Sequence, residues 1–154
     1  LILNNDLTSG LPALLNGISQ PMVPEPIRGW HMRRKSQHFQ AYCETARDFA
    51  QHFGFDPWLI SAVNQRSEGL DFKQRQGLEG LQQTVADVLA KIAEKYREHG
   101  ITEAPYVFLK ADAGTYGMGI MTVQRPEEVM ELNKKARNKM DVIKEGTHVS
   151  EVLV

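Results

Sequence analysis

Two stretches of the chain carry apolar residues at helical spacing. The first spans residues 36–53, and Gly54 follows it where a left-handed C-terminal cap is typical. The second spans residues 76–99, and its apolar stripe consists of Leu78, Leu81, Val85, Val88, Leu89, Ile92 and Tyr96. We predict a helix for each stretch. A short helix is also expected to begin at the pair Asp56-Pro57, which combines a good N-cap with a good first-turn residue.

The last fifty residues alternate between strand-like and helix-like patterns. The β-branched and aromatic residues of "PYVFLKA" (105–111) and "GIMTVQ" (119–124) predict two strands. In "EEVMELNKKARNKM" (127–140), acids come first and bases last, as the dipole of an amphipathic helix favours. Two more strands are expected in "DVIKE" and "VSEVLV", and "LIL" at residues 1–3 reads as a buried strand end. The chain is therefore predicted to be α/β (α+β), with a helical segment before the strands.

Composition narrows the class of protein. The 154 residues are 42% hydrophobic and 24% charged, with a formal net charge of −1, which gives no general attraction to nucleic acid or anionic membranes. No apolar run approaches the roughly 18 residues that span a bilayer. Cys43 is the single cysteine, which excludes an internal disulfide and suits a reducing cytoplasm. The chain lacks an initiator methionine and both its ends fall in strand-like runs, so we expect truncation at both ends.

The stretch "KADAGTYGMG" (110–119) is rich in glycine and lies between two predicted strands. Walker A and Rossmann glycine loops both open a helix, so neither motif fits here. A loop between strands can instead act as a flap, because glycines let consecutive backbone N–H groups turn toward one anion. Lys110 would add a point charge for phosphates. The alternative from spacing alone is an ordinary hairpin with a surface lysine.

Several separated blocks resemble one family of enzymes. The segment "VFLKADAGTYGMGIMTV" is similar to the nucleotide-covering hairpin of ATP-grasp ligases. Together with "LNNDLTSG", "GWHMRRKSQHF" and "DPWLI", it resembles the proteobacterial type of glutamate–cysteine ligase. The resemblance implies a partial ATP-grasp-like fold. Residues 1–35 would come from a preceding substrate domain, 36–104 would be helical, and 105–154 would open the nucleotide-binding region.

The resemblance also implies a reaction and a set of site residues. ATP would phosphorylate the γ-carboxylate of glutamate, and the amine of cysteine would attack the acyl phosphate, giving γ-glutamylcysteine for glutathione synthesis. Lys110 would hold the α/β-phosphates, and Leu153 and Val154 would border the base. The lid over the nucleotide would consist of Gly114, Thr115, Tyr116, Gly117, Met118 and Gly119. Magnesium is implied as well, but its ligands are expected beyond Val154, so we predict no metal site in this chain.

Four residues outside the loop are predicted to bind substrate. Arg33 and Arg34, in the basic segment "HMRRK", suit recognition of a carboxylate or phosphate. Asn5 and Asp6 follow a predicted strand, and the carboxyl ends of strands often bind ligands. The alternatives are solvated surface charge for the arginines and an Asx turn or helix cap for Asn5 and Asp6.

The residues are also compatible with other functions. The protein could be another ATP-grasp carboxylate–amine ligase, or a nucleotide-binding module without chemistry. The basic segment could bind RNA, but the near-neutral net charge and the absence of a second basic cluster argue against nucleic-acid partners. Asp112 could orient Lys110 or cap a turn. The residues leave the amino-acid substrate and the oligomeric state undetermined.

Overall fold

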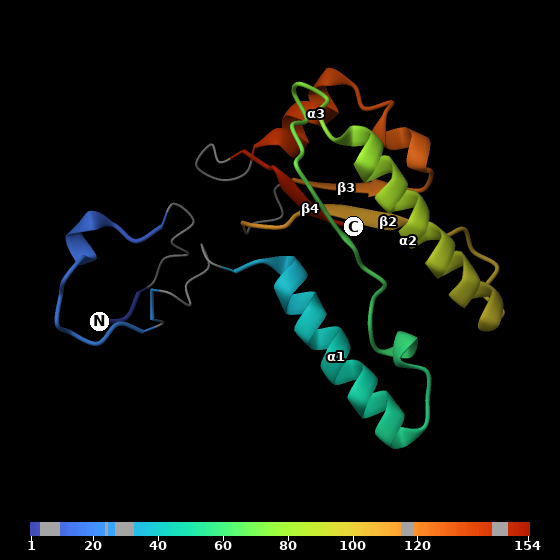
Figure 1. Ribbon diagram of the computed structural model, residues 1–154, viewed down its shortest axis with the longest axis horizontal. Helices are drawn as coiled ribbons and strands as arrows, with labels where there is room; N and C mark the ends of the chain where they lie inside the picture. The colour runs from blue at the N-terminus through green and yellow to red at the C-terminus, as the bar shows by residue number, and fades with distance from the viewer. Residues whose placement is uncertain (4–9, 24, 27–32, 115–118, 143–147) are drawn as a thin grey trace.

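The computed structural model describes residues 1–3, 10–23, 25–26, 33–114, 119–142 and 148–154. Within these residues it combines helices with one antiparallel sheet, which confirms the predicted mixed fold (Figure 1). The α-helices are α1 (Lys35–Phe53), α2 (Leu78–Glu98) and α3 (Lys134–Asp141). The strands are β1 (Arg66–Glu68), β2 (Val107–Ala111), β3 (Ile120–Val123) and β4 (Glu151–Leu153). Short 3-10 helices are η1 (Ala13–Leu15), η4 (Pro57–Leu59) and η5 (Pro126–Val129).

The sheet places a strand from the end of the chain in its middle. Its order is β1-β4-β2-β3, and every neighbouring pair is antiparallel. Strands β2 and β3 form the predicted hairpin around the glycine loop, with Lys110 opposite Ile120. On its other side Lys110 lies opposite Leu153 of β4. The residue that opens the glycine loop is therefore held between two strands.

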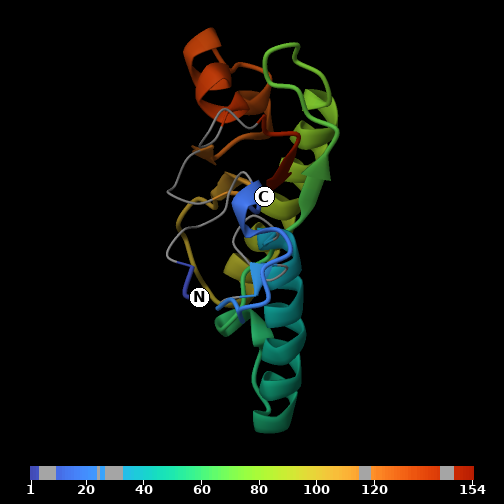
Figure 2. The ribbon, with the colours of Figure 1, turned by 90° about the vertical axis from the view of Figure 1, so that its left-hand side faces the viewer.

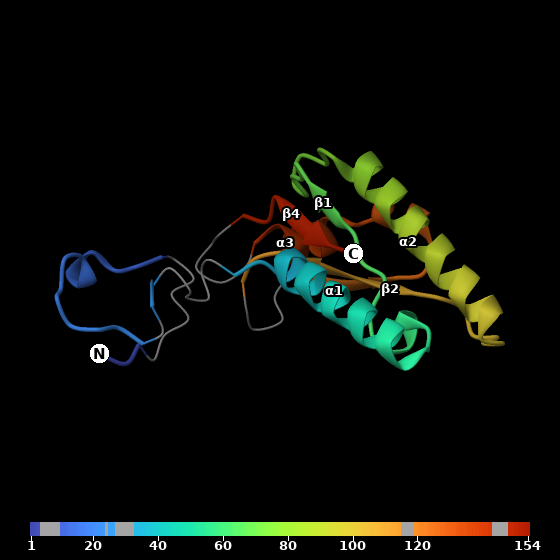
Figure 3. The ribbon, with the colours of Figure 1, turned by 60° about the horizontal axis from the view of Figure 1, so that its bottom comes forward.

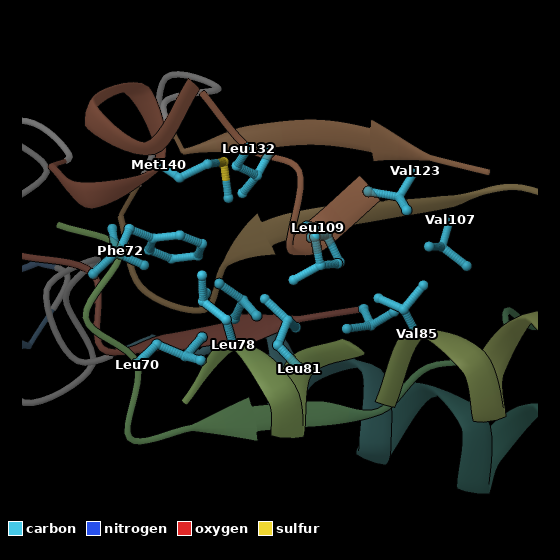
Figure 4. Close-up of a cluster of buried hydrophobic side chains, with 14 of the residues drawn as sticks. Leu70, Phe72, Leu78, Leu81, Val85, Val107, Leu109, Val123, Leu132 and Met140 are labelled. Atoms are coloured by element: carbon cyan, nitrogen blue, oxygen red, sulfur yellow. The ribbon is translucent and has the colours of Figure 1, made fainter. Parts of the chain in front are cut away.

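One face of β2 builds the core. Val107, Leu109 and Ala111 are buried, whereas Phe108 is 45% exposed, because successive side chains of a strand point to opposite faces. Helix α2 covers the buried face with its apolar stripe. Figure 4 shows Leu78, Leu81 and Val85 of this helix directed at Leu109 and its neighbours. Loop residue Phe72 and Met140 of α3 complete this cluster.

Helix α1 extends away from the sheet, as Figures 1 and 2 show, and in Figure 3 it lies in front of the sheet. Gly54 ends it in the left-handed conformation, with φ of 73°, as predicted. Ala46 and Ala50 are its buried residues, and they face the returning segment that holds η4. Tyr42, Phe49 and Phe53 of the same helix stay exposed, Phe53 to 62%. No helix among the described residues is long and apolar enough to cross a membrane.

The helix predicted over residues 127–140 is wrong in its first half. The structure has the short η5, a break, and then α3. Asn133 causes the break, because its side chain accepts a hydrogen bond from the backbone N–H of Ala136 at 2.9 Å and so starts a new helix. The acids therefore belong to η5 and the bases to α3.

Three smaller predictions also need correction. The helix expected after Asp56 is a single 3-10 turn, η4. The "LIL" segment is not buried, since Ile2 is 82% exposed and makes an isolated bridge with Val23. In "DVIKE", Asp141 ends α3 and Val142 forms an isolated bridge with His148, while residues 143–147 lie outside the described residues. Strand β1 was not predicted, because its residues are Arg-Ser-Glu and lack an apolar run.

Candidate functional site

Lys110 occupies the central part of the sheet. Because it alternates with Leu109, its side chain leaves β2 on the face opposite the core. The ammonium lies 5.1 Å from the centroid of the Phe108 ring, which is within range of a cation–π contact. The backbone of Lys110 pairs with β3 on one side and β4 on the other. A charge carried by such a strand is held more rigidly than one on a loop.

A cavity of about 340 Å³ opens beside Lys110. Sites for small ligands typically measure roughly 300–1,000 Å³, are mostly apolar, and hold a few polar groups. This cavity likewise has mostly apolar walls and a few polar groups. Its walls come from α1, the segment between η4 and β1, α2, β2 and the end of β4. They include Phe39, Trp58, Asn64, Tyr96, Tyr106, Phe108, Leu153 and Val154.

The cavity brings together three residues of the predicted site. Lys110, Leu153 and Val154 all line it, because the pairing of β2 with β4 sets Leu153 directly beside Lys110. Trp58 is half-buried and also lines the cavity, with its ring stacked on His99 at 4.9 Å between centroids. An Asp-Pro pair before an aromatic residue was the local signal for this position, because Asp56 caps η4 and thereby orients Trp58.

The glycine loop is described at its two ends. Gly114 and Gly119 both adopt positive φ, 84° and 62°, where glycine is favoured. The carbonyl of Gly119 accepts a hydrogen bond from the N–H of Ala111 at 2.9 Å, which closes the hairpin. Thr115, Tyr116, Gly117 and Met118 lie outside the described residues. Their role as a lid therefore stays a prediction.

The N-terminus of α1 is attached to this loop. Asp112, only 1% exposed, accepts hydrogen bonds on its carboxylate from the N–H of Ser36 at 2.7 Å and its hydroxyl at 2.8 Å. Asp112 therefore caps a distant helix and does not cap a turn of its own loop. The Lys35 ammonium donates to backbone carbonyls at the loop base. Burial lowers the pKa of Lys35, the Asp112 carboxylate opposes this, and the charges of Lys110 and Arg34 lower the pKa further.

The basic segment therefore lies beside the loop. Arg33, Arg34 and His38 line a small hollow of about 140 Å³ together with Asp112 and Gly114. Arg34 also borders a hollow of about 200 Å³ on the side of Ser150 and Glu151. The structure thus brings both predicted arginines to the loop base. Asn5 and Asp6 lie outside the described residues, and their substrate role stays a prediction.

One cluster in the described part of the chain has the composition of a metal site. Ligand atoms of Asp56, Glu98 and His99 lie within 4.8 Å of one another. The Lys95 ammonium already bonds both carboxylates, at 2.9 Å to Asp56 and 2.7 Å to Glu98. A cation would have to displace this lysine, so the cluster fits an ion-pair network better than it fits magnesium.

The same cluster predicts an unusually acidic aspartate. The backbone N–H of Trp58 and then the Lys95 ammonium lower the pKa of Asp56 from 3.8 to about 2. Because the folded-state pKa is the lower one, these contacts stabilise the fold above about pH 4, and their contribution is lost as the pH falls toward 2. We expect carboxyl-carbon NMR of labelled aspartate to give a midpoint near 2. Lys95→Met should raise it, though not fully to 3.8, since Trp58 still donates.

Lys91→Met is the matched control, because Lys91 is an exposed lysine of the same helix, four positions before Lys95. It should leave the midpoint of Asp56 where it is. An Asp56 midpoint near 4 in the unmodified protein would contradict the ion-pair network.

Comparison with known proteins gives this site its context. All of residues 1–154 match the family model described as Glutamate-cysteine ligase. The chain is also similar to a crystal structure named "Putative gamma-glutamylcysteine synthetase", from Methylobacillus flagellatus KT, with 50% sequence identity and a TM-score of 0.84. The similarity covers 99% of this chain and 36% of that one, so this chain spans about a third of that protein's length. No curated protein matches. Because the family model matches the whole chain, the chain belongs to the glutamate-cysteine ligase family.

Proposed function

We propose that the protein containing this chain is an ATP-dependent ligase that joins the γ-carboxylate of glutamate to the amine of cysteine through an acyl phosphate. The product would be γ-glutamylcysteine, the first intermediate of glutathione synthesis. Membership of the ligase family supports the reaction. The observation that carries the nucleotide site is the position of Lys110 on a central strand, at the wall of an aromatic cavity that Leu153 and Val154 also line.

The cavity fits a nucleotide in shape and chemistry. A flat base has π-faces that suit aromatic and apolar walls, here Trp58, Tyr106, Phe108 and Leu153. The polyphosphate would then extend toward Lys110, whose ammonium neutralises the α/β-phosphates. Neutralising charge on a phosphoryl group as it transfers, in a site that excludes water, is the main catalytic demand of this reaction class.

The glycine loop would complete the enclosure. We infer that the backbone amides of Gly114, Thr115, Tyr116, Gly117, Met118 and Gly119 cover the phosphates as a lid. Arg33 and Arg34, at the base of that loop, would bind an anion of the substrate, either a carboxylate or the phosphate being transferred. Asn5 and Asp6 are proposed as further substrate contacts.

Magnesium would supply further charge neutralisation for the phosphates when bound. In the described part of the chain, the Asp56 cluster is bridged by Lys95 and does not fit the ion. We therefore assign no step of the reaction to a metal ligand of this chain. We place the reaction in the cytoplasm, where a free thiol such as that of Cys43 stays reduced.

The test is a coupled assay on a full-length protein that carries this chain. ATP, magnesium, glutamate and cysteine are supplied together, and ADP and γ-glutamylcysteine are measured. We expect ADP release to depend on both amino acids, with one dipeptide formed per ADP. Nucleotide binding without turnover would instead indicate a non-catalytic binding module. Turnover with a different carboxylate or amine would indicate another ligase of the ATP-grasp type.

A further inference from the structure

The base of the glycine loop is held by a side chain from outside the hairpin. The Lys35 ammonium donates to the carbonyls of Ala111 at 2.6 Å, Gly114 at 3.0 Å and Ala113 at 3.3 Å. An ammonium has three N–H donors, so these bonds use all of them. Lys35 is thus engaged with backbone in the one turn where β2 becomes the loop, and it has no donor left for a ligand.

A second set of bonds ties the same turn to the start of α1. The carbonyl of Asp112 accepts from the N–H of Lys35 at 2.9 Å, and its carboxylate accepts from both donors of Ser36. A carboxylate at a helix N-terminus is stabilised by the helix dipole. The residue before the helix, Arg34, supplies no side-chain cap, so Asp112 provides one from the turn that follows β2.

These bonds also involve the central strand of the sheet. The N–H of Asp112 donates to the carbonyl of Glu151 in β4 at 3.0 Å, and Ala111 pairs with Val152. Lys110 is the residue immediately before this anchored turn. Its neighbours in sequence therefore bond β4 on one side and α1 on the other, and the direction of its side chain depends on that turn keeping its shape.

We propose that Lys35 and Asp112 form a latch that fixes the turn at residues 111–114 and thereby positions Lys110 for the nucleotide. Lys35 is a positioning residue in this arrangement, and it acts through the backbone of residues 111–114. This inference rests on the proposed nucleotide site. The three cations of "HMRRK" would then have different roles. Arg33 and Arg34 are proposed to bind substrate, whereas Lys35 holds the backbone beside Lys110.

The charges around the latch link it to ligand binding. Burial lowers the pKa of Lys35 and the Asp112 carboxylate raises it, while the charges of Lys110 and Arg34 lower it further, so these two cations repel the Lys35 ammonium. A polyphosphate between these cations would relieve the repulsion. Nucleotide binding should therefore favour the charged form of Lys35, and that charged form should favour nucleotide binding by the same free energy.

The test compares Lys35→Met with Lys73→Met in a full-length protein that carries this chain. Lys73 is the control because its ammonium pairs with a buried carboxylate, that of Asp141, at 2.9 Å, whereas the Lys35 ammonium bonds the carbonyls of the loop base. For Lys35→Met we expect the KM for ATP to rise about tenfold or more, with the KM values of glutamate and cysteine within about twofold of wild type. Lys73→Met should leave all three within about twofold.

Two further variants define the mechanism. Lys35→Arg keeps the charge, but its planar fork does not fit three carbonyls around one point, so it should not restore the KM for ATP. Ser36→Ala removes a single bond to Asp112 and should give a smaller rise in the same direction. Ser36→Ala also keeps the test valid if Lys35→Met does not fold.

Direct binding of a fluorescent ATP analogue separates this inference from the proposed reaction. If the wild type binds the analogue without ligating glutamate to cysteine, the proposed function fails, yet the loss of affinity in Lys35→Met still supports the latch. The latch is overturned if Lys35→Met and Ser36→Ala bind the analogue as wild type does. It is also overturned if Lys35→Met and Lys73→Met shift all three KM values equally.

Discussion

Replacing Lys110 with alanine in a full-length protein that carries this chain is expected to lower the rate of γ-glutamylcysteine formation by about 10²–10³-fold. The ammonium is proposed to neutralise phosphate charge that increases in the transition state, and loss of one such group in a water-poor site has an effect of this size. Stability should change little, because the ammonium contacts the Phe108 ring, and such a contact is worth up to about 1 kcal/mol at exposed sites. Steady-state kinetics and a thermal melt give the two readouts.

Lys135→Ala is the control for this variant, since Lys135 is an exposed lysine of α3 and does not line the cavity. It should keep wild-type kinetics. Wild-type kinetics in Lys110→Ala would remove this lysine from the site. A large fall in the melting temperature together with the loss of activity would show that Lys110 stabilises the fold.

Leu109→Ala, one position earlier, is expected to lower the stability of the fold and to leave the kinetic constants unchanged. Leu109 is fully buried between β2 and α2, so truncating it should cost about 2–5 kcal/mol through lost burial and the cavity that remains (Figure 4). The kinetic constants per folded molecule should persist at low temperature, because the change lies on the face of β2 away from Lys110. Urea unfolding and kinetics at two temperatures measure both quantities.

Thr122→Ala supplies the comparison for this variant. Thr122 lies opposite Phe108 in the same hairpin and is exposed, so its loss should cost less than about 1 kcal/mol. If Leu109→Ala melts with wild type, then β2 does not form the core wall described above. If it stays folded but inactive, the two faces of β2 are coupled more closely than their contacts indicate.

Local signals predicted much of the fold. Helix α2 combines a long apolar stripe with a following glycine, and α1 ends at Gly54 as its sequence indicates. The hairpin was predictable because β-branched and aromatic residues flank the glycines on both sides. In each case the residues that determine the element lie within it or next to it.

Elements that depend on distant partners were missed. Strand β1 has no apolar run, and it forms because β4 pairs with it and Arg66 bonds Glu151 at 2.7 Å and Glu68 at 3.1 Å. Those two glutamates lie directly opposite each other, so the guanidinium offsets their repulsion. Nothing local in Arg-Ser-Glu indicates this arrangement. The split between η5 and α3 was missed for a different reason. The acids at the start and the bases at the end of residues 127–140 suit the dipole of one continuous helix, so the N-cap at Asn133 was overlooked.

The candidate site shows the same division. Lys110 and the loop glycines could be chosen from sequence because their chemistry is contained in one short segment. The latch could not, since Ser36 and Asp112 are 76 positions apart and their side chains are common in turns and caps. Leu153 and Val154 were named through the family resemblance, and the β2–β4 register sets Leu153 beside Lys110.

The position of β4 constrains how the protein folds during synthesis. Of the described strands it leaves the ribosome last, yet it belongs between β1 and β2. Until it arrives, both neighbours present unpaired backbone edges, which are prone to associate with other chains. Nascent chains that pause before Glu151 should therefore depend most on chaperones, and the surroundings of Lys110 include Leu153 only after β4 has paired with β2.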